Sequence, residues 1–203
     1  MSQVTVGLVD YGIGNHASIV HSLRDLDVRV RISSEARVLE GTDLLILPGV
    51  GAFPAAMQAL HRQGLVTFLR EQATANRPII GICLGMQLLA TASHEFHYTE
   101  GLDIIPGEVV ELSNAKWHIG WNTLTCTDAD PLLRGSDGQS FYFNHSFGYQ
   151  GSDEYKIGMT EYFGLQTAVI RKGRVVGLQF HPEKSQACGK TLLQTLMLGL
   201  LHA

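Results

Sequence analysis

The chain has 203 residues, of which 45% are hydrophobic and 17% charged, and its net charge is −4. This length suits one domain whose core needs neither disulfides nor metals, and it leaves no room for a second catalytic domain. The sequence has no basic run that could follow a phosphate backbone, which argues against nucleic acid as a partner. We therefore expect a single compact domain spanning residues 1–203.

Cysteine usage and apolar stretches indicate where the protein works. Cys83, Cys126 and Cys188 are an odd and widely spaced set, which indicates a reducing compartment and not a disulfide framework. Residues 1–10 resemble a buried strand and lack the basic start and cleavage site of a signal peptide. The longest apolar stretch, 192–201, is far shorter than the roughly 20 residues needed to cross a bilayer. The sequence thus predicts a cytoplasmic protein with no membrane partner.

The first half of the chain alternates strand-like with helix-like patterns. Short apolar runs predict buried strands at 4–9, 28–32, 44–47 and 79–82. Amphipathic patterns predict helices at 17–26, 55–60, 65–75 and 86–90. This alternation is typical of a mostly parallel sheet covered by helices on both faces, with catalytic turns at the carboxyl ends of the strands.

From about Gly101 the pattern changes to short strands separated by turn residues. Strands are expected at 108–112, 123–126, 140–143, 166–171 and 175–180, and a packing helix at 191–202. The last two strands form a hairpin joined at Lys172 and Gly173, where glycine can supply the positive φ of a tight turn. The expected fold class is therefore α/β, with a central, mostly parallel sheet, helices on both faces and a more antiparallel C-terminal half.

Cys83 is the candidate nucleophile. It stands in Gly81-Ile82-Cys83-Leu84-Gly85, between a predicted strand and a predicted helix, which is the pattern of a nucleophile elbow with sulfur in place of oxygen. Glycines two residues before and after it would let the chain turn sharply and lift the thiol into solvent. A helix N-terminus also favours the thiolate, which is the reactive form. A buried structural thiol is the alternative interpretation.

A histidine and a carboxylate complete a candidate triad. His181 and Glu183 follow the last predicted strand, and together they suggest a general base whose ring is oriented by the carboxylate. On its own, His181 could equally be a structural histidine at a strand end, with its hydrogen bonds made within the fold. The backbone N–H groups of Leu84 and of Val50, in the 48–51 turn, are the candidate oxyanion donors. That turn could also be no more than a surface connection.

Three other features of the sequence are weighed against this site. Gly12-Ile13-Gly14-Asn15-His16-Ala17 matches a glycine-rich dinucleotide motif, with Glu35 at about the usual distance, although a tight strand-to-helix connection has the same features. His94-Glu95-Phe96-His97 has metal-binding residue types but lacks the i, i+4 spacing of a helical zinc motif, so no metal is expected. The remaining histidines are expected in solvent, among them His16, His21 and His61.

Five sequence strings, spread over nearly the whole chain, carry a family resemblance. They lie at residues 10–15, 47–53, 81–89, 120–122 and 180–185. They resemble class I glutamine amidotransferases, and more narrowly the glutaminase subunits of imidazole glycerol phosphate synthase. The cysteine elbow and His-Pro-Glu fit the whole class, whereas Pro-Gly-Val-Gly-Ala-Phe and His-Pro-Glu-Lys-Ser point to this subfamily. The resemblance implies the class I glutamine amidotransferase (flavodoxin-like) fold.

The resemblance also implies that L-glutamine is the substrate. Cys83 would attack its side-chain amide to give a thioester and ammonia, and water would then release glutamate. His181 would carry the protons, and Glu183 would orient it. The residues implied to hold glutamine are Gly51, Gln87, Glu95, His145 and Ser146. With this substrate the Gly12 turn needs no dinucleotide, and the chain needs no cofactor.

A partner follows from the chemistry and from the resemblance. Ammonia released into neutral water becomes mostly ammonium, which is not nucleophilic, and this chain has no space for an acceptor site. The resemblance implies a (β/α)8-barrel cyclase subunit that forms a heterodimer with this chain and makes imidazole glycerol phosphate and AICAR in histidine biosynthesis. The positions implied near the junction are Asn15, Trp121, Tyr142 and Lys184, and the aromatic ones suit interface hot spots.

Several positions depart from the family pattern. Trp117 stands in place of the usual proline, Asn144 in place of an apolar residue, residues 90–94 lack the usual aromatic and acidic side chains, and the turn at 162–164 is one residue longer. None of them belongs to the triad. They leave open a paralogous subunit serving another barrel synthase, such as one that aminates a surface sugar, or a stand-alone thiol amidohydrolase. A non-catalytic dinucleotide-binding module is the alternative outside the enzymes.

Overall fold

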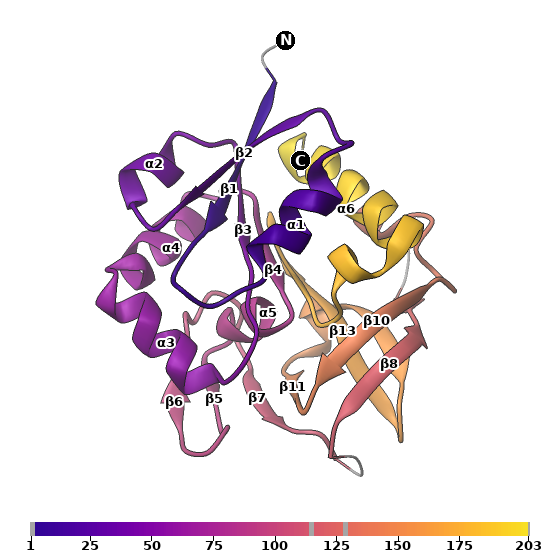
Figure 1. Cartoon of the computed structure of the whole chain (residues 1–203). Helices are drawn as coiled ribbons and strands as arrows, with labels where there is room; N and C mark the ends of the chain where they lie inside the picture. The colour runs from indigo at the N-terminus through magenta and orange to yellow at the C-terminus, as the bar shows by residue number, and fades with distance from the viewer. Residues whose placement is uncertain (1–2, 114–115, 128–129, 203) are drawn as a thin grey trace.

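The structure is a computed structural model that describes residues 3–113, 116–127 and 130–202. Met1 and Ser2, which begin the strand-like segment 1–10, lie outside these ranges. An eight-stranded sheet runs through the centre (Figure 1). Its strands follow in the order β2 (Val28–Ser33), β1 (Val4–Val9), β3 (Leu44–Leu47), β4 (Ile79–Ile82), β14 (Val175–Leu178), β13 (Leu165–Lys172), β12 (Lys156–Glu161) and β9 (Thr125–Cys126).

Strand direction divides this sheet into two parts. The strands from β2 to β14 pair in parallel, whereas β13, β12 and β9 add antiparallel pairs at one edge. This arrangement confirms the predicted α/β class with a more antiparallel C-terminal half. The carboxyl ends of β3, β4 and β14 lie side by side, because these three strands are neighbours.

Helices cover both faces of the parallel part (Figure 1). One face carries α1 (His16–Leu23) and α6 (Gln186–Leu201). The other carries α2 (Ala36–Glu40), α3 (Phe53–Arg62), α4 (Leu65–Thr74) and the short α5 (Leu84–Leu88), which directly follows β4. The sequence did not predict α2, because five residues are too short to show a helical period. It placed the start of α6 five residues late, because the first turn, Gln-Ala-Cys-Gly, has no apolar stripe.

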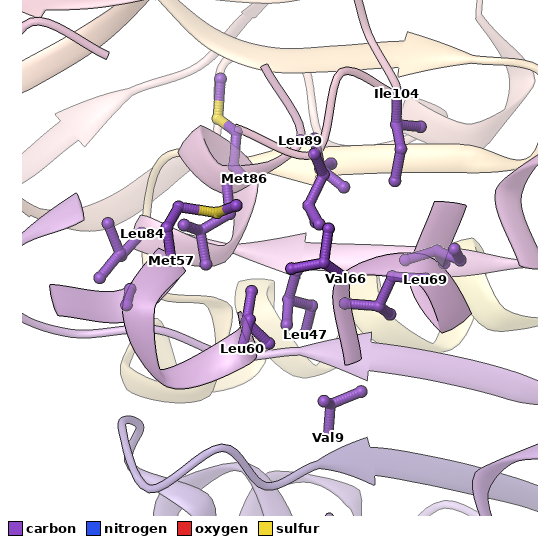
Figure 2. Close-up of a cluster of buried hydrophobic side chains, with 14 of the residues drawn as sticks. Val9, Leu47, Met57, Leu60, Val66, Leu69, Leu84, Met86, Leu89 and Ile104 are labelled. Carbon is purple, nitrogen blue, oxygen red and sulfur yellow. The ribbon is translucent and has the colours of Figure 1, made fainter. Parts of the chain in front are cut away.

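Alternate side chains of each parallel strand build two separate cores. Leu45 and Leu47 of β3 pack with α3 and α4 in one cluster, whereas Leu44 and Ile46 pack with α1 and α6 in the other. Figure 2 shows part of the first cluster, where side chains of α3, α4 and α5 gather above β3. Because both of their faces are covered, the inner strands β3, β4 and β14 are continuous apolar runs, and the apolar pattern located them within two residues.

The sequence only partly predicted two smaller sheets, which take most of their strands from the second half of the chain. β8 (His118–Thr123) pairs with β10 (Ser140–His145), and a four-stranded sheet has the order β11 (Phe147–Gln150), β7 (Glu108–Glu111), β5 (Ala92–Ser93) and β6 (Thr99–Glu100). The expected strand at 123–126 is wrong, because Thr123 ends β8 and β9 starts a new pairing at Thr125. The inward positions of β8 are not apolar, so no alternation marked it.

The β13–β14 hairpin is confirmed, with a shift of one residue. Lys172 pairs with Val175, so the two-residue loop is Gly173 and Arg174. Gly173 has φ of 59°, which is the positive value that the turn requires. Among the described residues, none of the helices combines the length and the apolar content that crossing a bilayer requires.

Leu196 and Leu198 of α6 provide a matched test of how this helix packs. Leu196 is fully buried, and Leu198 is 52% exposed. We expect Leu196→Ala to lower the free energy of unfolding by about 2–5 kcal/mol, because it removes buried methyl groups and leaves a cavity. Leu198→Ala should change it by no more than about 0.5 kcal/mol. Urea unfolding measures both variants, and equal losses would contradict the burial of this face of α6.

Candidate active site

Cys83 occupies a strained turn between β4 and α5. Its φ is 54° and its ψ is −111°, a backbone conformation that a residue with a Cβ rarely adopts. Gly81 and Gly85 do not have positive φ, so the strain is on the cysteine itself and not on its glycines. A Cβ on Gly81 would lie 2.6 Å from Gly85 O, and one on Gly85 would overlap Leu47 O. The glycines are needed for close packing around the turn.

The Cys83 thiol lies inside a cavity and not in solvent. The cysteine is 6% exposed, so the expected exposure of the thiol is wrong. Its Sγ lies 3.7 Å from Asn144 O of β10. The cavity has a volume of about 220 Å³ and is lined by Val50, Gly51, Cys83, Leu84, Gln87, Glu95, Asn144, His145, Ser146, Phe147 and His181. Residues from five separate parts of the chain therefore meet around one sulfur atom.

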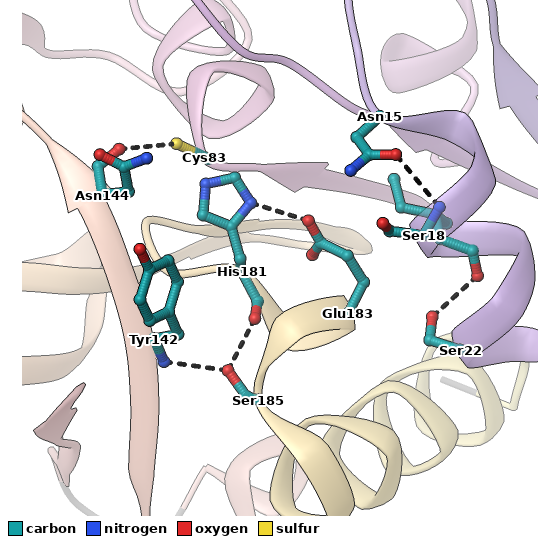
Figure 3. A network of polar contacts seen from close by, with 10 residues as sticks. Asn15, Ser18, Ser22, Cys83, Tyr142, Asn144, His181, Glu183 and Ser185 are labelled. Carbon is teal, nitrogen blue, oxygen red and sulfur yellow. Dashed lines mark hydrogen bonds and ion pairs between the residues drawn. The ribbon is translucent and has the colours of Figure 1, made fainter. Parts of the chain in front are cut away.

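His181 stands between Cys83 and Glu183 (Figure 3). Its Nδ1 is 2.8 Å from Glu183 Oε1, and both side chains are almost completely buried. The backbone around the ring is also held, because His181 N donates to Tyr142 O at 2.8 Å and Ser185 Oγ donates to His181 O at 2.6 Å. Since Nδ1 engages the carboxylate, Nε2 is the nitrogen left for Cys83. The structure thus brings together the three residues predicted as a triad.

The electrostatics of His181 suit a residue that gives and takes protons. Burial alone would lower the pKa of the ring, but hydrogen bonds to Cys83 and Glu183 outweigh it and raise the pKa to about 9. The ring therefore carries a proton at neutral pH. A buried carboxylate at hydrogen-bond distance compensates the charge of the imidazolium.

The 48–51 turn lies directly over the cysteine turn. A Cβ on Gly49 would lie 2.7 Å from Gly85 N, so only glycine allows this approach. The Tyr11 hydroxyl donates to Pro48 O at 2.6 Å, and burial raises the pKa of this tyrosine far above its usual range. Val50 and Leu84, the candidate oxyanion donors, consequently line the same cavity as the thiol.

Gln87 and Glu95 offer acceptors to a ligand in the cavity. Gln87 Nε2 donates to Phe147 O at 2.7 Å and to Gln179 Oε1 at 3.2 Å, so its own Oε1 is left for a ligand. Glu95 Oε2 accepts from Phe53 N at 2.7 Å. A carboxylate and an amide oxygen suit the ammonium group of an amino acid. Sequence reasoning missed Gln179, which comes just before the Phe-His-Pro-Glu string and is fully buried.

His145 lines the cavity, but its ring is committed to internal partners. Nδ1 lies 2.9 Å from Phe147 O, and Nε2 lies 3.2 Å from His118 Nδ1. Burial lowers the pKa of His145 to about 4, so the ring is neutral at physiological pH. Neither nitrogen is free for a ligand. Any contact of this residue with glutamine would use its backbone or the edge of its ring.

Three of the four positions expected at a partner junction form one surface cluster. The rings of Trp121 and Tyr142 lie 6.2 Å apart edge to face, and Lys184 Nζ lies 5.8 Å from the Tyr142 ring. Tyr142 is in turn 6.5 Å from His181. Asn15 instead caps α1, where its Oδ1 accepts from Ser18 N at 3.2 Å. Ile119, 57% exposed and two residues before Trp121 on β8, adds an apolar neighbour that sequence analysis missed.

The other candidate features of the sequence have local contacts of their own. The Gly12 N–H donates to Asp10 Oδ1 at 3.0 Å, as in a local Asx turn. No group of three potential metal ligands occurs in the described parts of the chain. His21 and His61 are exposed, as expected, but His16 is half-buried. His118 is buried, so the expectation that the remaining histidines lie in solvent is wrong for these two.

Comparison with known proteins shows the family to which the chain belongs. The sequence profile of class I glutamine amidotransferases matches residues 7–198, and the chain belongs to this family. Solved structures share the fold: PurLQS from Thermotoga maritima has a TM-score of 0.77 at 19% identity, covering 98% of this chain and 100% of that one. A glutamine amidotransferase from the same organism has a TM-score of 0.75 at 16% identity, covering both chains fully.

Curated relatives narrow the family further. The imidazole glycerol phosphate synthase subunit HisH of Carboxydothermus hydrogenoformans is 43% identical over 192 residues, covering 93% of this chain and 96% of the relative. HisH of Listeria monocytogenes is 42% identical over 191 residues, covering 92% of each. At this identity and coverage, the chain belongs with the HisH subunits.

The His181–Glu183 pair predicts a specific pH dependence of stability. The pKa of folded His181, about 9, is above that of an unfolded histidine, about 6.5. Its stabilising contribution is therefore complete below pH 6.5 and is lost as the pH rises through 9. In Glu183→Gln the pKa of His181 should fall, so this decline of the free energy of unfolding should shrink. Urea unfolding between pH 6 and 9.5 measures it.

Glu108→Gln provides the control for this experiment, because it removes the carboxylate that lies 3.0 Å from the exposed His94. It should leave the decline between pH 6.5 and 9 as in the wild type. If the free energy of unfolding falls with pH equally in the wild type and in Glu183→Gln, the carboxylate does not raise the pKa of His181.

Proposed function

We propose that this chain is the glutaminase subunit of an imidazole glycerol phosphate synthase, with Cys83, His181 and Glu183 as its catalytic triad in a single amidotransferase domain. The observation that carries this proposal is the cavity in which the strained Cys83 turn faces the His181–Glu183 pair. The identity with HisH subunits supports the assignment to histidine biosynthesis.

The first half of the proposed reaction releases ammonia. The Cys83 thiolate, whose proton is carried by His181, attacks the side-chain amide carbon of L-glutamine, and the C–N bond then breaks to leave a glutamyl thioester. Protonated His181 gives its Nε2 proton to the departing nitrogen, so the leaving group is neutral ammonia. Glu183 holds Nδ1 and keeps the ring in the required orientation.

The second half regenerates the enzyme. Neutral His181 takes a proton from a water molecule, whose oxygen attacks the thioester carbon. The C–S bond breaks, glutamate leaves, and the thiolate and the imidazolium are restored. In both halves negative charge develops on the former carbonyl oxygen, and the N–H groups of Val50 and Leu84 are the proposed donors to it. Gly51, Gln87, Glu95, His145 and Ser146 are proposed to hold the glutamine.

The proposed partner is a (β/α)8-barrel cyclase that takes the ammonia directly. Transfer must be direct because ammonia becomes mostly ammonium in neutral water. Trp121, Tyr142 and Lys184 form an exposed cluster next to His181, close to the point where ammonia is released. A partner bound over this cluster and Asn15 would cover the site. Aromatic side chains are often the anchors of such interfaces.

A glutaminase assay with and without the barrel subunit and its nucleotide ligand tests the coupled activity. Hydrolysis should increase when both are added. A rate that is already high and unchanged by them would instead indicate the stand-alone thiol amidohydrolase. Activation only by a different barrel protein would indicate the paralogous subunit.

Cys83→Ala should separate the two activities of the complex. Glutamine-dependent synthesis should fall by about 10³-fold or more, because the nucleophile is gone. Synthesis from added ammonium salts should remain, because it bypasses this chain's chemistry. Cys188→Ala, at a half-buried thiol 3.2 Å from Gln139 Oε1, is the matched control and should retain both activities. Loss of ammonium-dependent synthesis in Cys83→Ala would contradict this division of labour.

Trp121→Ala should weaken binding of the barrel subunit. Truncating an aromatic anchor costs about 2 kcal/mol or more, which corresponds to a Kd about 30-fold higher. Calorimetric titration of the barrel subunit measures it. Ile32→Ala, at an exposed residue of the edge strand β2, is the control and should leave the Kd unchanged. Equal Kd values for both variants would place the interface elsewhere.

A further inference from the structure

His118 is a buried histidine that the proposed mechanism does not use. It begins β8 and is 2% exposed. Its ring is stacked between Tyr162, with centroids 3.9 Å apart, and Phe143, with centroids 4.4 Å apart, and both stacks are nearly parallel. An apolar ring would fill this space equally well. The hydrogen bonds of its two nitrogens therefore need a separate explanation.

His118 belongs to a series of hydrogen bonds that runs from Asn122 through His118 and His145 to Phe147 O. The groups at both ends of this series fix which nitrogens donate. At one end Phe147 O is a carbonyl and can only accept, so His145 Nδ1 carries the proton. Burial lowers the pKa of both histidines to about 4, so each ring carries a single proton. His145 Nε2 must then accept, and the His118 Nδ1–H, 3.2 Å away, must donate.

Asn122, at the other end of this hydrogen-bond series, requires the same donors and acceptors. Asn122 Oδ1 accepts from Thr123 N at 2.8 Å, which fixes the orientation of the amide. Asn122 Nδ2 donates to Glu161 O at 2.8 Å, and it also lies 3.2 Å from His118 Nε2, to which its second N–H can donate. His118 Nε2 is therefore an acceptor, and Nδ1 is the nitrogen that carries the proton. Two independent anchors give one tautomer.

This series of hydrogen bonds ends at the wall of the glutamine cavity. Phe147 O accepts from His145 Nδ1 and also from Gln87 Nε2, at 2.9 and 2.7 Å. If His145 took the other tautomer, a nitrogen lone pair would face this carbonyl oxygen, and the carbonyl would have to move. Movement of Phe147 O would displace the amide of Gln87. The proton on His118 Nδ1 therefore affects the position of Gln87 Oε1, the acceptor that Gln87 presents to a ligand.

We propose that His118 is a positioning residue for glutamine binding: by donating to His145 it fixes the tautomer that holds Phe147 O, and through it Gln87, in place. The proposal rests on the proposed glutaminase function of the cavity. It gives the inner face of β8 a role in the site, whereas its outer face carries Ile119 and Trp121.

Two substitutions at this position separate the hydrogen bond from the stack. His118→Phe keeps a flat ring between Tyr162 and Phe143 but cannot donate, and it leaves His145 Nε2 without a partner. His118→Asn loses the stack but can place an amide N–H near the position of Nδ1. If His118 were merely structural, the less stable variant, His118→Asn, would have the higher KM for glutamine. If His118 positions the site, His118→Phe should have the higher KM, because it has lost the donor.

Glutaminase kinetics of the complex and urea unfolding are measured for both variants. For His118→Phe we expect the KM for glutamine to rise about 10-fold, with kcat changed less than about threefold, because a buried acceptor loses its donor. For His118→Asn we expect a KM within about threefold of the wild type, even though the protein is less stable. His61→Phe, at an exposed histidine of α3, should change neither parameter. A KM that rises more in His118→Asn than in His118→Phe would overturn the proposal.

Nitrogen NMR tests the same inference without relying on activity. In the wild type, His118 and His145 should both show the Nδ1–H tautomer. In His118→Phe, the signals of the Gln87 side-chain amide should shift, and in His118→Asn they should stay near their wild-type positions. An Nε2–H tautomer of His145 in the wild type would end the proposal. A wild-type complex that does not hydrolyse glutamine would instead refute the proposed function, and the tautomer result would stand apart from it.

Discussion

The site depends on a backbone conformation at Cys83 that its surroundings impose. A positive φ at a residue with a Cβ costs about 1–3 kcal/mol and persists only where neighbouring contacts enforce it. Those contacts are visible on both sides of the turn: Cys83 N donates to Leu178 O at 2.7 Å, and Gln87 N donates to Cys83 O at 3.2 Å. The end of β14 and the first turn of α5 thus hold the turn that carries the sulfur.

Two buried histidines in one cavity have opposite protonation states because their neighbours differ. His181 faces a carboxylate and a thiol, and its pKa is raised to about 9. His145 faces a carbonyl and a neutral histidine, and burial lowers its pKa to about 4. One ring can exchange protons with a substrate, and the other can only hold its position. Such a divergence of pKa values assigns separate roles to chemically identical side chains.

The parts of the fold and site that sequence analysis predicted are those with local signals. The inner parallel strands β3, β4 and β14 are continuous apolar runs, and Cys83 lies in a short glycine-flanked motif between strand and helix. The missed strand β8 presents His118, Gly120 and Asn122 inward, so no apolar alternation marks it. The roles of His118 and Gln179 depend on partners 27 and 92 residues away, and no local pattern records such pairs. The depth of the thiol likewise depends on the 48–51 turn folding over it.

The enclosure of the thiol has a consequence for chemical reagents. A reactive cysteine on an open surface meets every oxidant and electrophile in solution, whereas Cys83 meets only molecules that can enter a cavity of about 220 Å³. Whether a covalent inhibitor modifies Cys83 should then depend more on the width of the inhibitor than on its intrinsic reactivity. We expect a slender electrophile shaped like an amino-acid side chain to modify the sulfur faster than a broad aromatic maleimide.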